Sequence, residues 1–567
     1  MANTIKLKRG SGAPGTLAAG EIALDTSNGT FYVGDGSAVQ ELSLGATPNS
    51  ASFTAAGSIA DGAAVAIRDD GKVEDIGAAT AGTAVVYESA SMSGGSNYMH
   101  SVYHPKENKT VFIYRDGGNS GYLTYNVGTV TAGTNAIAFS GSAAVIASAD
   151  YRDNTAAYDH SSEGIMVVAK DDSSQDSDSF IGHLSGTTVT WQSEVEFSSN
   201  AHTRPCSVYY PTINRFLTMH YSSGGGSDLT MNTSKVVGTT LSHPLKDNEP
   251  MGTNNVGLLT NSIRGLVYIP DIDMVAASYA GNSGYDNNDL QLTVFGATTG
   301  TAGTSTDDDV FGRKIHNVYK FRPNAGANFT QVESVVCSDY DRHTKRLVTL
   351  VESNFNGLYV VVSRVSKGGI YPESQLRLDV GDYTNFDSEF SQKHDIVYCD
   401  HAKCFVVLVQ GRDLINTYDL VAIQVYVHID KHGKAYMSQD DAVSLKACSD
   451  TNGKWAASSY DTTAKRLVLG YADQDNSNYG TAIVIRPSAN QRFIGFAQGS
   501  ASDGGSVSVL TKGALDAKNS SLVVGGHYYL KPDGTVSLKS DDNLREKHWP
   551  YVGKALSATQ IAIYNEG

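Results

Sequence analysis

Short runs of hydrophobic and polar positions alternate along most of this chain, and one arrangement of them recurs seven times. Each recurrence has a tyrosine, a polar turn and then an apolar run, as in YDRHTKRLVTLV from Tyr340. Successive tyrosines lie 55, 52, 58, 72, 58 and 62 residues apart, which gives a period of about 60 residues. The seven tyrosines are Tyr103, Tyr158, Tyr210, Tyr268, Tyr340, Tyr398 and Tyr460.

Each recurrence contains enough strand-forming sequence for an antiparallel meander of about four strands, the content of one propeller blade. We therefore predict an all-β protein with a seven-bladed β-propeller over residues 91–488. Gly82–Ser89 is expected to pair beside Gly480–Pro487 and so to close the circle of blades. Tandem β-sandwich modules are the alternative, although a sandwich needs about seven strands and about 100 residues per module. The tyrosine before each turn is expected to pack blades together rather than to form an aromatic binding ladder.

The two ends of the chain differ from this repetitive middle. IADGAAVAI and RDDGKVEDI (Ile59–Ile76) are similar to SDGGSVSVL (Ser502–Leu510) and LKPDGTVSL (Leu530–Leu538). In each pair, a strand after an Asp-Gly or Asp-Gly-Gly turn is followed by a second Asp-Gly hairpin. We infer one small β-domain built from residues 46–90 and 489–567, with the propeller inserted between its halves; two unrelated small β-domains remain the alternative.

The first 45 residues carry a further pattern. A basic strand (Ile5–Arg9) precedes a turn (Gly10–Pro14), the segment LAAGEIA (Leu17–Ala23), and FYVGDG (Phe31–Gly36). This order and spacing resembles the short N-terminal module of tailed-bacteriophage virion proteins, especially tail fibres. The resemblance implies a virion-attachment module over residues 1–45, and it implies threefold association of the chain. From the residues themselves we expect a small meander that is too small to bury a core alone.

Composition narrows the classes of function. The net charge is −16, and the densest basic cluster is Lys6–Arg9, so nucleic-acid binding is disfavoured. The chain has no apolar run of 18 residues, and its start lacks the apolar core of a secretion signal. We expect a soluble protein made in the host cytoplasm, without membrane insertion.

Candidate chemistry is sparse. Acidic clusters at Asp171–Asp178, Asp307–Asp309 and Asp473–Asn478 could supply oxygen ligands to calcium, but solvated loops are the preferred interpretation. The five cysteines (Cys206, Cys337, Cys399, Cys404 and Cys448) are expected to be buried free thiols rather than disulfides or a zinc site. Motifs for glycoside hydrolysis, nucleophile elbows and phosphate loops are missing from the sequence. We therefore name no catalytic, cofactor-binding or metal-binding residue.

Four loops rich in Gly, Ser, Asn and Tyr are the expected binding loops. They are Gly117–Gly121, Tyr221–Asp228, Ala280–Asp289 and Asp473–Gly480. The leading hypothesis is a structural virion protein of a tailed phage, a tail fibre or receptor-binding appendage that presents these loops to a glycan or protein of the host surface. Its other partners would be virion tail or capsid proteins and two further copies of itself, in contact through residues 1–90 and 489–567. The alternatives are a tail nozzle, connector or head-decoration protein, and a glycan-cleaving propeller enzyme.

Overall fold

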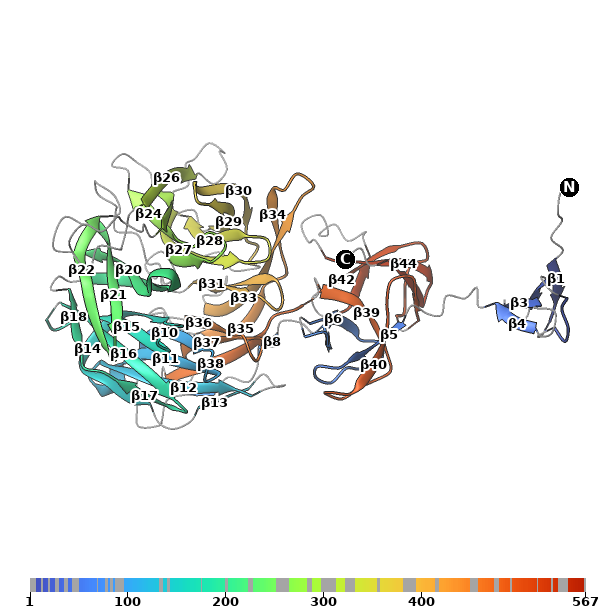
Figure 1. Ribbon diagram of the computed structural model, residues 1–567, viewed down its shortest axis with the longest axis horizontal. Helices are drawn as coiled ribbons and strands as arrows, with labels where there is room; N and C mark the ends of the chain where they lie inside the picture. The colour runs from blue at the N-terminus through green and yellow to red at the C-terminus, as the bar shows by residue number, and fades with distance from the viewer. Residues whose placement is uncertain are drawn as a thin grey trace. The chain divides into compact units, whose positions relative to one another are not determined.

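The computed structural model contains strands and two short 3-10 helices, η1 (Gly117–Asn119) and η2 (Pro211–Ile213), among the residues that it describes. The chain forms two compact units, a meander unit (Ala79–Pro487) and a flanking unit (Met1–Ala78 with Ser488–Gly567) (Figure 1). The structure describes residues 7–11, 14–18, 21–25, 30–34, 39–42, 50–68, 70–76, 80–81, 85–86, 96–131, 136–139, 143–174, 176–198, 202–222, 228–250, 265–282, 288–296, 313–321, 332–353, 357–380, 394–412, 418–448, 457–473, 479–489, 492–517, 519–531, 534–538 and 549–564.

The described strands of the meander unit form seven antiparallel meanders that follow one another along the chain. The first two share one long strand, β14, and so make a nine-stranded sheet. The strands of meanders one to three are β10 (Ser96–His104), β11 (Lys109–Asp116), β12 (Tyr122–Val130), β13 (Ile137–Phe139), β14 (Ala144–Tyr158), β15 (Gly164–Asp171), β16 (Ser177–Ser185), β17 (Thr188–Trp191), β18 (Val195–Ser198), β19 (His202–Tyr210), β20 (Arg215–Ser222), β21 (Asp228–Val237) and β22 (Thr240–Pro250).

The remaining four meanders each form a separate sheet. Their strands are β23 (Leu266–Ile269), β24 (Met274–Asn282), β25 (Asn288–Gly296), β26 (Arg313–Phe321), β27 (Val332–Asp341), β28 (Arg346–Ser353), β29 (Gly357–Ser366), β30 (Gly369–Arg377), β31 (Asp395–Cys399), β32 (Cys404–Arg412), β33 (Tyr418–Ile429), β34 (Ala435–Gln439), β35 (Val443–Cys448), β36 (Ala457–Asp461), β37 (Arg466–Asp473) and β38 (Tyr479–Arg486). The protein is therefore all-β over its described residues, as the sequence predicts.

The turn after the first strand of each meander has one backbone conformation throughout. Five residues after each turn tyrosine, a residue with positive φ reverses the chain; these residues are Asn108, Glu163, Asn214, Asp273, Lys345, Lys403 and Lys465, with φ between 50° and 59°. In three of the turns an aspartate next to the tyrosine accepts a backbone N–H bond. Asp159 accepts from Ser161, Asp341 from His343, and Asp461 from Thr463. Such Asx turns explain why Asp and Thr recur at fixed distances from the tyrosine.

In the third meander the prediction of the turn tyrosine was wrong by one residue. Asn214 lies five positions after Tyr209, and Tyr209 makes the hydrogen bond to Asn214 Oδ1 at 2.8 Å. Tyr210, the tyrosine assigned from the sequence, instead donates to the backbone of Asp273 in the fourth meander. The pair Tyr209–Tyr210 gives two candidate registers that only the turn geometry separates.

Hydrophobic clusters fill the spaces between successive meanders. Each of the seven clusters in this unit draws its buried residues from two meanders that follow one another in the chain, or from the last and the first. In the cluster between last and first, Met99 and Phe112 of meander one pack with Val468 and Val484 of meander seven. A meander therefore buries its two faces against different neighbours, as expected for sheets that lack a core of their own.

The seventh meander is completed by residues from far earlier in the chain. β8 (Thr80–Ala81) and β9 (Val85–Val86) pair antiparallel with β38, with Thr80 opposite Arg486 and Val86 opposite Thr481. The pairing expected between Gly82–Ser89 and Gly480–Pro487 is present in this register. The chain thus enters and leaves the meander unit through one sheet.

The N-terminal residues form a separate four-stranded sheet. Its strands are β1 (Leu7–Gly10), β2 (Ile22–Asp25), β3 (Thr30–Gly34) and β4 (Val39–Leu42). β1 and β2 are parallel, with Leu7 opposite Ile22, so the prediction of a simple meander was wrong for this pair. A parallel pair needs a crossover rather than a hairpin, and the connection between Gly10 and Ile22 supplies it.

Two further sheets of the flanking unit share one strand order. Module one runs β5-β40-β39-β6-β7 and module two runs β41-β45-β44-β42-β43. Their strands are β5 (Ser50–Thr54), β6 (Ala64–Ile67), β7 (Val73–Asp75), β39 (Phe493–Gln498), β40 (Ser506–Leu510), β41 (Leu515–Asp516), β42 (His527–Leu530), β43 (Val536–Leu538), β44 (Tyr551–Ser557) and β45 (Gln560–Ile563). Buried residues of both modules, including Phe493, Leu510, Leu530 and Ile561, form one hydrophobic cluster.

The two modules agree residue by residue. Gly62 and Gly525 have φ of 81° and 80°, and Gly71 and Gly534 have φ of 76° and 78°. A Cβ atom on Gly495 or on Gly553 would lie 1.8 Å from a backbone oxygen of the adjacent strand, so both positions require glycine. The two sheets are therefore copies of one five-stranded module, and the whole meander unit occupies the β7–β39 connection of the first copy.

This equivalence corrects one part of the sequence comparison. The hairpins at Gly71 and Gly534 correspond, but the strand before the second hairpin is β42 rather than β40. The segment before β40 and the segment before β6 instead contact each other reciprocally: Gly57 N–H donates to Asp503, and Gly499 N–H donates to Asp61. The resemblance of β40 to β6 reflects this local two-fold relation.

Candidate functional site

The loop Gly117–Gly121 is the one of the four expected binding loops that the structure describes in full. It contains η1, which Asp116 caps by accepting a 3.0 Å hydrogen bond from Gly118 N–H. Asp116 is almost fully buried, and burial raises the pKa of its carboxyl group. The central residues of the other three loops, 223–227, 283–287 and 474–478, lie outside the described residues, as does Asp307–Asp309.

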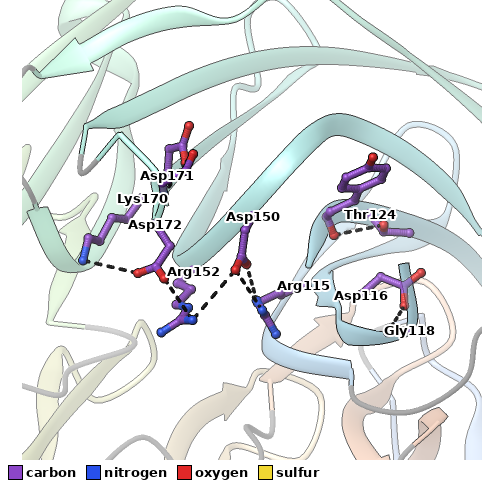
Figure 2. A network of polar contacts seen from close by, with 11 residues as sticks. Arg115, Asp116, Gly118, Thr124, Asp150, Arg152, Lys170, Asp171 and Asp172 are labelled. Carbon is purple, nitrogen blue, oxygen red and sulfur yellow. Dashed lines mark hydrogen bonds and ion pairs between the residues drawn. The ribbon is translucent and has the colours of Figure 1, made fainter. Parts of the chain in front are cut away.

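A network of ion pairs lies beside this loop and joins the first two meanders (Figure 2). Arg115 from the end of β11 binds both carboxylate oxygens of Asp150 in β14, at 2.6 and 3.0 Å. Arg152 lies 3.8 Å from Asp150 and 2.9 Å from Asp172, and Lys170 lies 3.8 Å from the other oxygen of Asp172. A bidentate arginine fixes the geometry of its partner, so Arg115 holds the bend of β14 against the Gly117–Gly121 loop.

Sequence reasoning missed this network, although the sequence contains a signal for it. The tripeptide Tyr-Arg-Asp occurs at Tyr114–Asp116 and again at Tyr151–Asp153, once in each of the first two meanders. Both arginines lie within ion-pair distance of Asp150. The repetition could have drawn attention to Arg115 and Arg152.

A second polar group centres on Tyr151. Its buried hydroxyl donates to Asp178 Oδ2 at 2.9 Å and lies 3.4 Å from Glu194 Oε2. Burial, together with the negative charge of Asp178, raises the pKa of Tyr151 well above its usual value. Burial also raises the pKa of Asp178 to about 6; the Tyr151 hydrogen bond lowers it, and the nearby Glu194 raises it. Two carboxylates thus share one hydroxyl donor.

Three carboxylates of the acidic cluster Asp171–Asp178 have separate partners within the protein. Asp171 accepts bonds from Ser173 and Ser174, Asp172 pairs with Arg152, and Asp178 accepts from Tyr151. No group of three or more His, Cys, Asp or Glu side chains that could hold a metal ion occurs within the described part of the chain. These carboxylates cap a loop and hold strands rather than converge on one point.

The turn tyrosines link neighbouring meanders, as the sequence analysis expects. Tyr340 donates to Asp271 at 2.7 Å, Tyr209 bonds Ser161 at 2.6 Å, and Tyr460 accepts from His401 N–H at 3.4 Å. In each case the partner lies three positions after the turn tyrosine of the preceding meander. Tyr103 of the first meander makes the same contact with Thr463 of the seventh, at 2.9 Å.

Four of the cysteines, Cys206, Cys337, Cys399 and Cys404, are buried free thiols, as predicted. Burial raises the pKa of the Cys399 and Cys404 thiols well above the usual value, which disfavours the reactive thiolate form. Nothing is described for the side chain of Cys448.

Comparison with known proteins identifies the N-terminal sheet. Residues 5–38 match the N-terminal domain of the major tropism determinant. The matched segment contains β1, β2 and β3 and covers the segment for which a phage module is expected. The chain therefore carries a phage tropism-determinant domain, which fits a virion component of the tail or tropism type.

The solved structures that the chain resembles are distant from it in sequence. The periplasmic gluconolactonase of Pseudomonas aeruginosa is 11% identical over 76% of this chain and 100% of its own, with a TM-score of 0.38. AofleA of Arthrobotrys oligospora is 8% identical over 65% of this chain and 90% of its own, with a TM-score of 0.34. Likenesses this weak bear on neither fold nor activity. No curated protein matches the chain.

Within the described residues, no helix is long and apolar enough to cross a membrane.

Proposed function

We propose that this protein is a tail fibre or receptor-binding appendage of a tailed phage. The N-terminal tropism-determinant domain carries this proposal, since it links the chain to phage tropism proteins. In this proposal, residues 1–45 attach the protein to other virion proteins, and the meander unit presents its loops to a glycan or protein on the host surface. The Gly117–Gly121 loop, which the Arg115–Asp150 pair braces, is one of these loops.

We further propose that the meander unit is a seven-bladed β-propeller. Support comes from the hydrophobic clusters, which join each meander to the next and the seventh to the first. The contact of Tyr103 with Thr463 repeats, between the ends of the series, a bond made between successive meanders. In Figure 1 the colours that mark chain order pass around this unit from β10 to β38, and β10 contacts β36. Tandem sandwiches would give no reason for a contact between the first and the last meander.

Attachment by the N-terminus has a direct test. Removing residues 1–45 is expected to abolish incorporation into the particle and to leave the meander unit folded, because its cores contain no residue of that segment. Particles are reconstituted with full-length or shortened protein, and incorporation is measured by immunoblotting. Normal incorporation of the shortened protein would contradict the proposal.

The receptor role is tested separately. The purified protein should bind host cells and compete with phage adsorption, and density for it should lie at the distal part of the tail in images of intact particles. Density at the tail axis or on the head, without competition, would instead indicate a nozzle, connector or decoration protein.

We also propose a homotrimer that associates through residues 1–90 and 489–567. The N-terminal sheet has four short strands, and unpaired sheet edges in proteins are normally covered or paired. Light scattering of the full-length protein should give three times the chain mass of 60.2 kDa. A strictly monomeric mass at micromolar concentration would oppose the trimer.

The protein is expected to lack hydrolase activity. In the described residues, the carboxylates of Asp178 and Glu194 are both within hydrogen-bond reach of the buried Tyr151. Incubation with host capsular or lipopolysaccharide glycans should release no reducing ends. Release of reducing ends that depends on Asp178 or Glu194 would overturn this expectation.

A further inference from the structure

Two turns at the same end of the meander unit carry an excess of exposed cations. The β27–β28 turn exposes Arg342, His343 and Lys345, and the β33–β34 turn exposes Lys431, His432 and Lys434. We call these six residues the turn patch. In a chain with a net charge of −16, four cations within two turns are a local reversal of charge.

Arg346 joins the two turns into one surface. Its guanidinium donates to Thr344 O at 3.0 Å in the first turn and to Gly433 O at 2.9 Å in the second. Glu373 Oε2 accepts a hydrogen bond from Arg346 Nε at 2.6 Å and a second one from Ala435 N–H at 3.2 Å. Arg346 and Glu373 neutralise each other and are mostly shielded from solvent. The pair therefore fixes the spacing of the exposed cations without neutralising them.

The acids in these turns are directed inward. Asp341 is 2% exposed and accepts from His343 N–H, Thr344 N–H and the Thr344 hydroxyl. Asp430 accepts from the backbone of His432 and Lys434. Asp271, a nearby acid, forms an ion pair with the patch, and its Oδ1 lies 3.1 Å from Lys345 Nζ. The Lys345 side chain nevertheless remains 64% exposed. The outward-facing charge of the turn patch is therefore positive.

From this surface we infer that the turn patch binds a polyanionic glycan, a sugar chain that carries carboxylate or phosphate groups. Lysines present point charges on flexible stems, which suits a chain of repeated anionic groups better than one fixed ligand. Tyr436, which follows the second turn, stacks on His428 with ring centroids 5.1 Å apart and is partly exposed. It supplies a flat apolar ring face with a polar tip next to the cations.

The turn patch fits other classes of partner less well than a polyanionic glycan. A protein partner would need an apolar centre, and Ile429 is the large hydrophobic side chain that the described residues of these turns expose. A nucleic acid has a denser line of charge and is normally held by more phosphate contacts than the four cations of the turn patch can make. The choice of a glycan rests on the proposed role at the host surface; the site itself lies at the turns, away from the Gly117–Gly121 loop at the opposite ends of the strands.

The test uses the purified full-length protein and two immobilised probes, alginate as a carboxylate glycan and phosphorylated mannan as a phosphate glycan, with dextran as the neutral control. Binding to at least one anionic probe is expected, and it should weaken as salt rises. The double variant Lys431→Gln/Lys434→Gln should bind about tenfold more weakly, since two exposed ion pairs are lost. The matched control, Lys512→Gln/Lys554→Gln, removes the same charge from exposed positions of the flanking unit and should bind as the parent does.

Three results would overturn the inference. They are equal binding to dextran and the anionic probes, equal loss in both double variants at unchanged melting temperature, and displacement of alginate by single-stranded DNA as effective as by alginate itself. The inference and the proposed receptor role can fail separately, because glycan binding is measured on the isolated protein and the receptor role by competition with phage adsorption.

Discussion

At the scale of single residues, the first two meanders concentrate charge that the fold must compensate. Arg115, Asp150, Arg152 and Asp172 pair with one another. Among the described residues, no cation pairs with Asp178, which shares the Tyr151 hydroxyl with Glu194. Compensated charges hold the loop and the bent strand in place. The uncompensated charge of Asp178 makes the free energy of unfolding depend on pH.

Asp178→Asn is expected to stabilise the protein near pH 7.5. Because the folded-state pKa of Asp178 is raised from 3.8 to about 6, the folded protein binds the proton more tightly than the unfolded chain does. The stabilising effect of that proton is fully present below about pH 4 and is lost as the pH rises through 6. Asparagine still accepts from Tyr151 and carries no charge, so we expect a gain of about 1–2 kcal/mol.

Thermal unfolding of parent and variant at pH 4 and pH 7.5 measures this effect. The gain should shrink at pH 4, where Asp178 is protonated in the folded protein and already partly protonated in the unfolded chain. A gain of the same size at both values of pH would show that charge is not its cause.

Gly121→Ala should destabilise the meander unit by about 1–3 kcal/mol. Gly121 has φ of +81°, and a Cβ atom there would lie 2.2 Å from Asp150 Oδ1 and 2.8 Å from Arg115 Nη2. The variant therefore combines backbone strain with displacement of the ion pair.

Gly186→Ala separates these two effects. Gly186 has φ of +60°, and a Cβ atom there would meet nothing within 4 Å. In urea unfolding, Gly121→Ala should cost more than Gly186→Ala. Equal costs would mean that the Arg115–Asp150 pair adjusts freely.

At the scale of elements, the turn tyrosine and the residue five positions later define each meander. The pattern was visible in the sequence because Asx turns and positive φ restrict which residues can follow the tyrosine. The register at Tyr209 could not be predicted because Tyr209 and Tyr210 both fit the pattern, and only the turn geometry separates them. The parallel pairing of β1 with β2 could not be predicted because it joins residues that are distant in sequence. The ion pairs around Asp150 were missed for the same reason: the bend in β14 brings Asp150 to Arg115, 35 residues away.

Tyr340→Phe should cost the meander unit about 1 kcal/mol. It removes the 2.7 Å bond from the Tyr340 hydroxyl to Asp271 and leaves the ring in the cluster between meanders four and five. Chemical unfolding measures the change. Tyr359→Phe is the matched control, because the Tyr359 hydroxyl has no hydrogen-bond partner in the described ranges; a cost as large there would contradict a role for the inter-meander bond.

At the scale of the whole molecule, the repeated module predicts that the meander unit can be removed. Module two closes the connection between β43 and β44 with the short segment 539–550, at the place where module one holds residues 76–492. Joining Ala78 to Ser488 through a copy of that segment should therefore leave both modules folded. Circular dichroism and a cooperative thermal transition would measure this, and an unfolded product would contradict the equivalence of the modules.

The entry and exit of the meander unit also determine how it would carry mechanical load. Thr80, on the way in, lies opposite Arg486, on the way out, within one sheet. Tension applied between the two units would pull on two chain connections that begin at neighbouring strands, and the seventh sheet would take the force first. The other six meanders are not in series with that tension, so a pull at the base of the unit would not unravel them one after another.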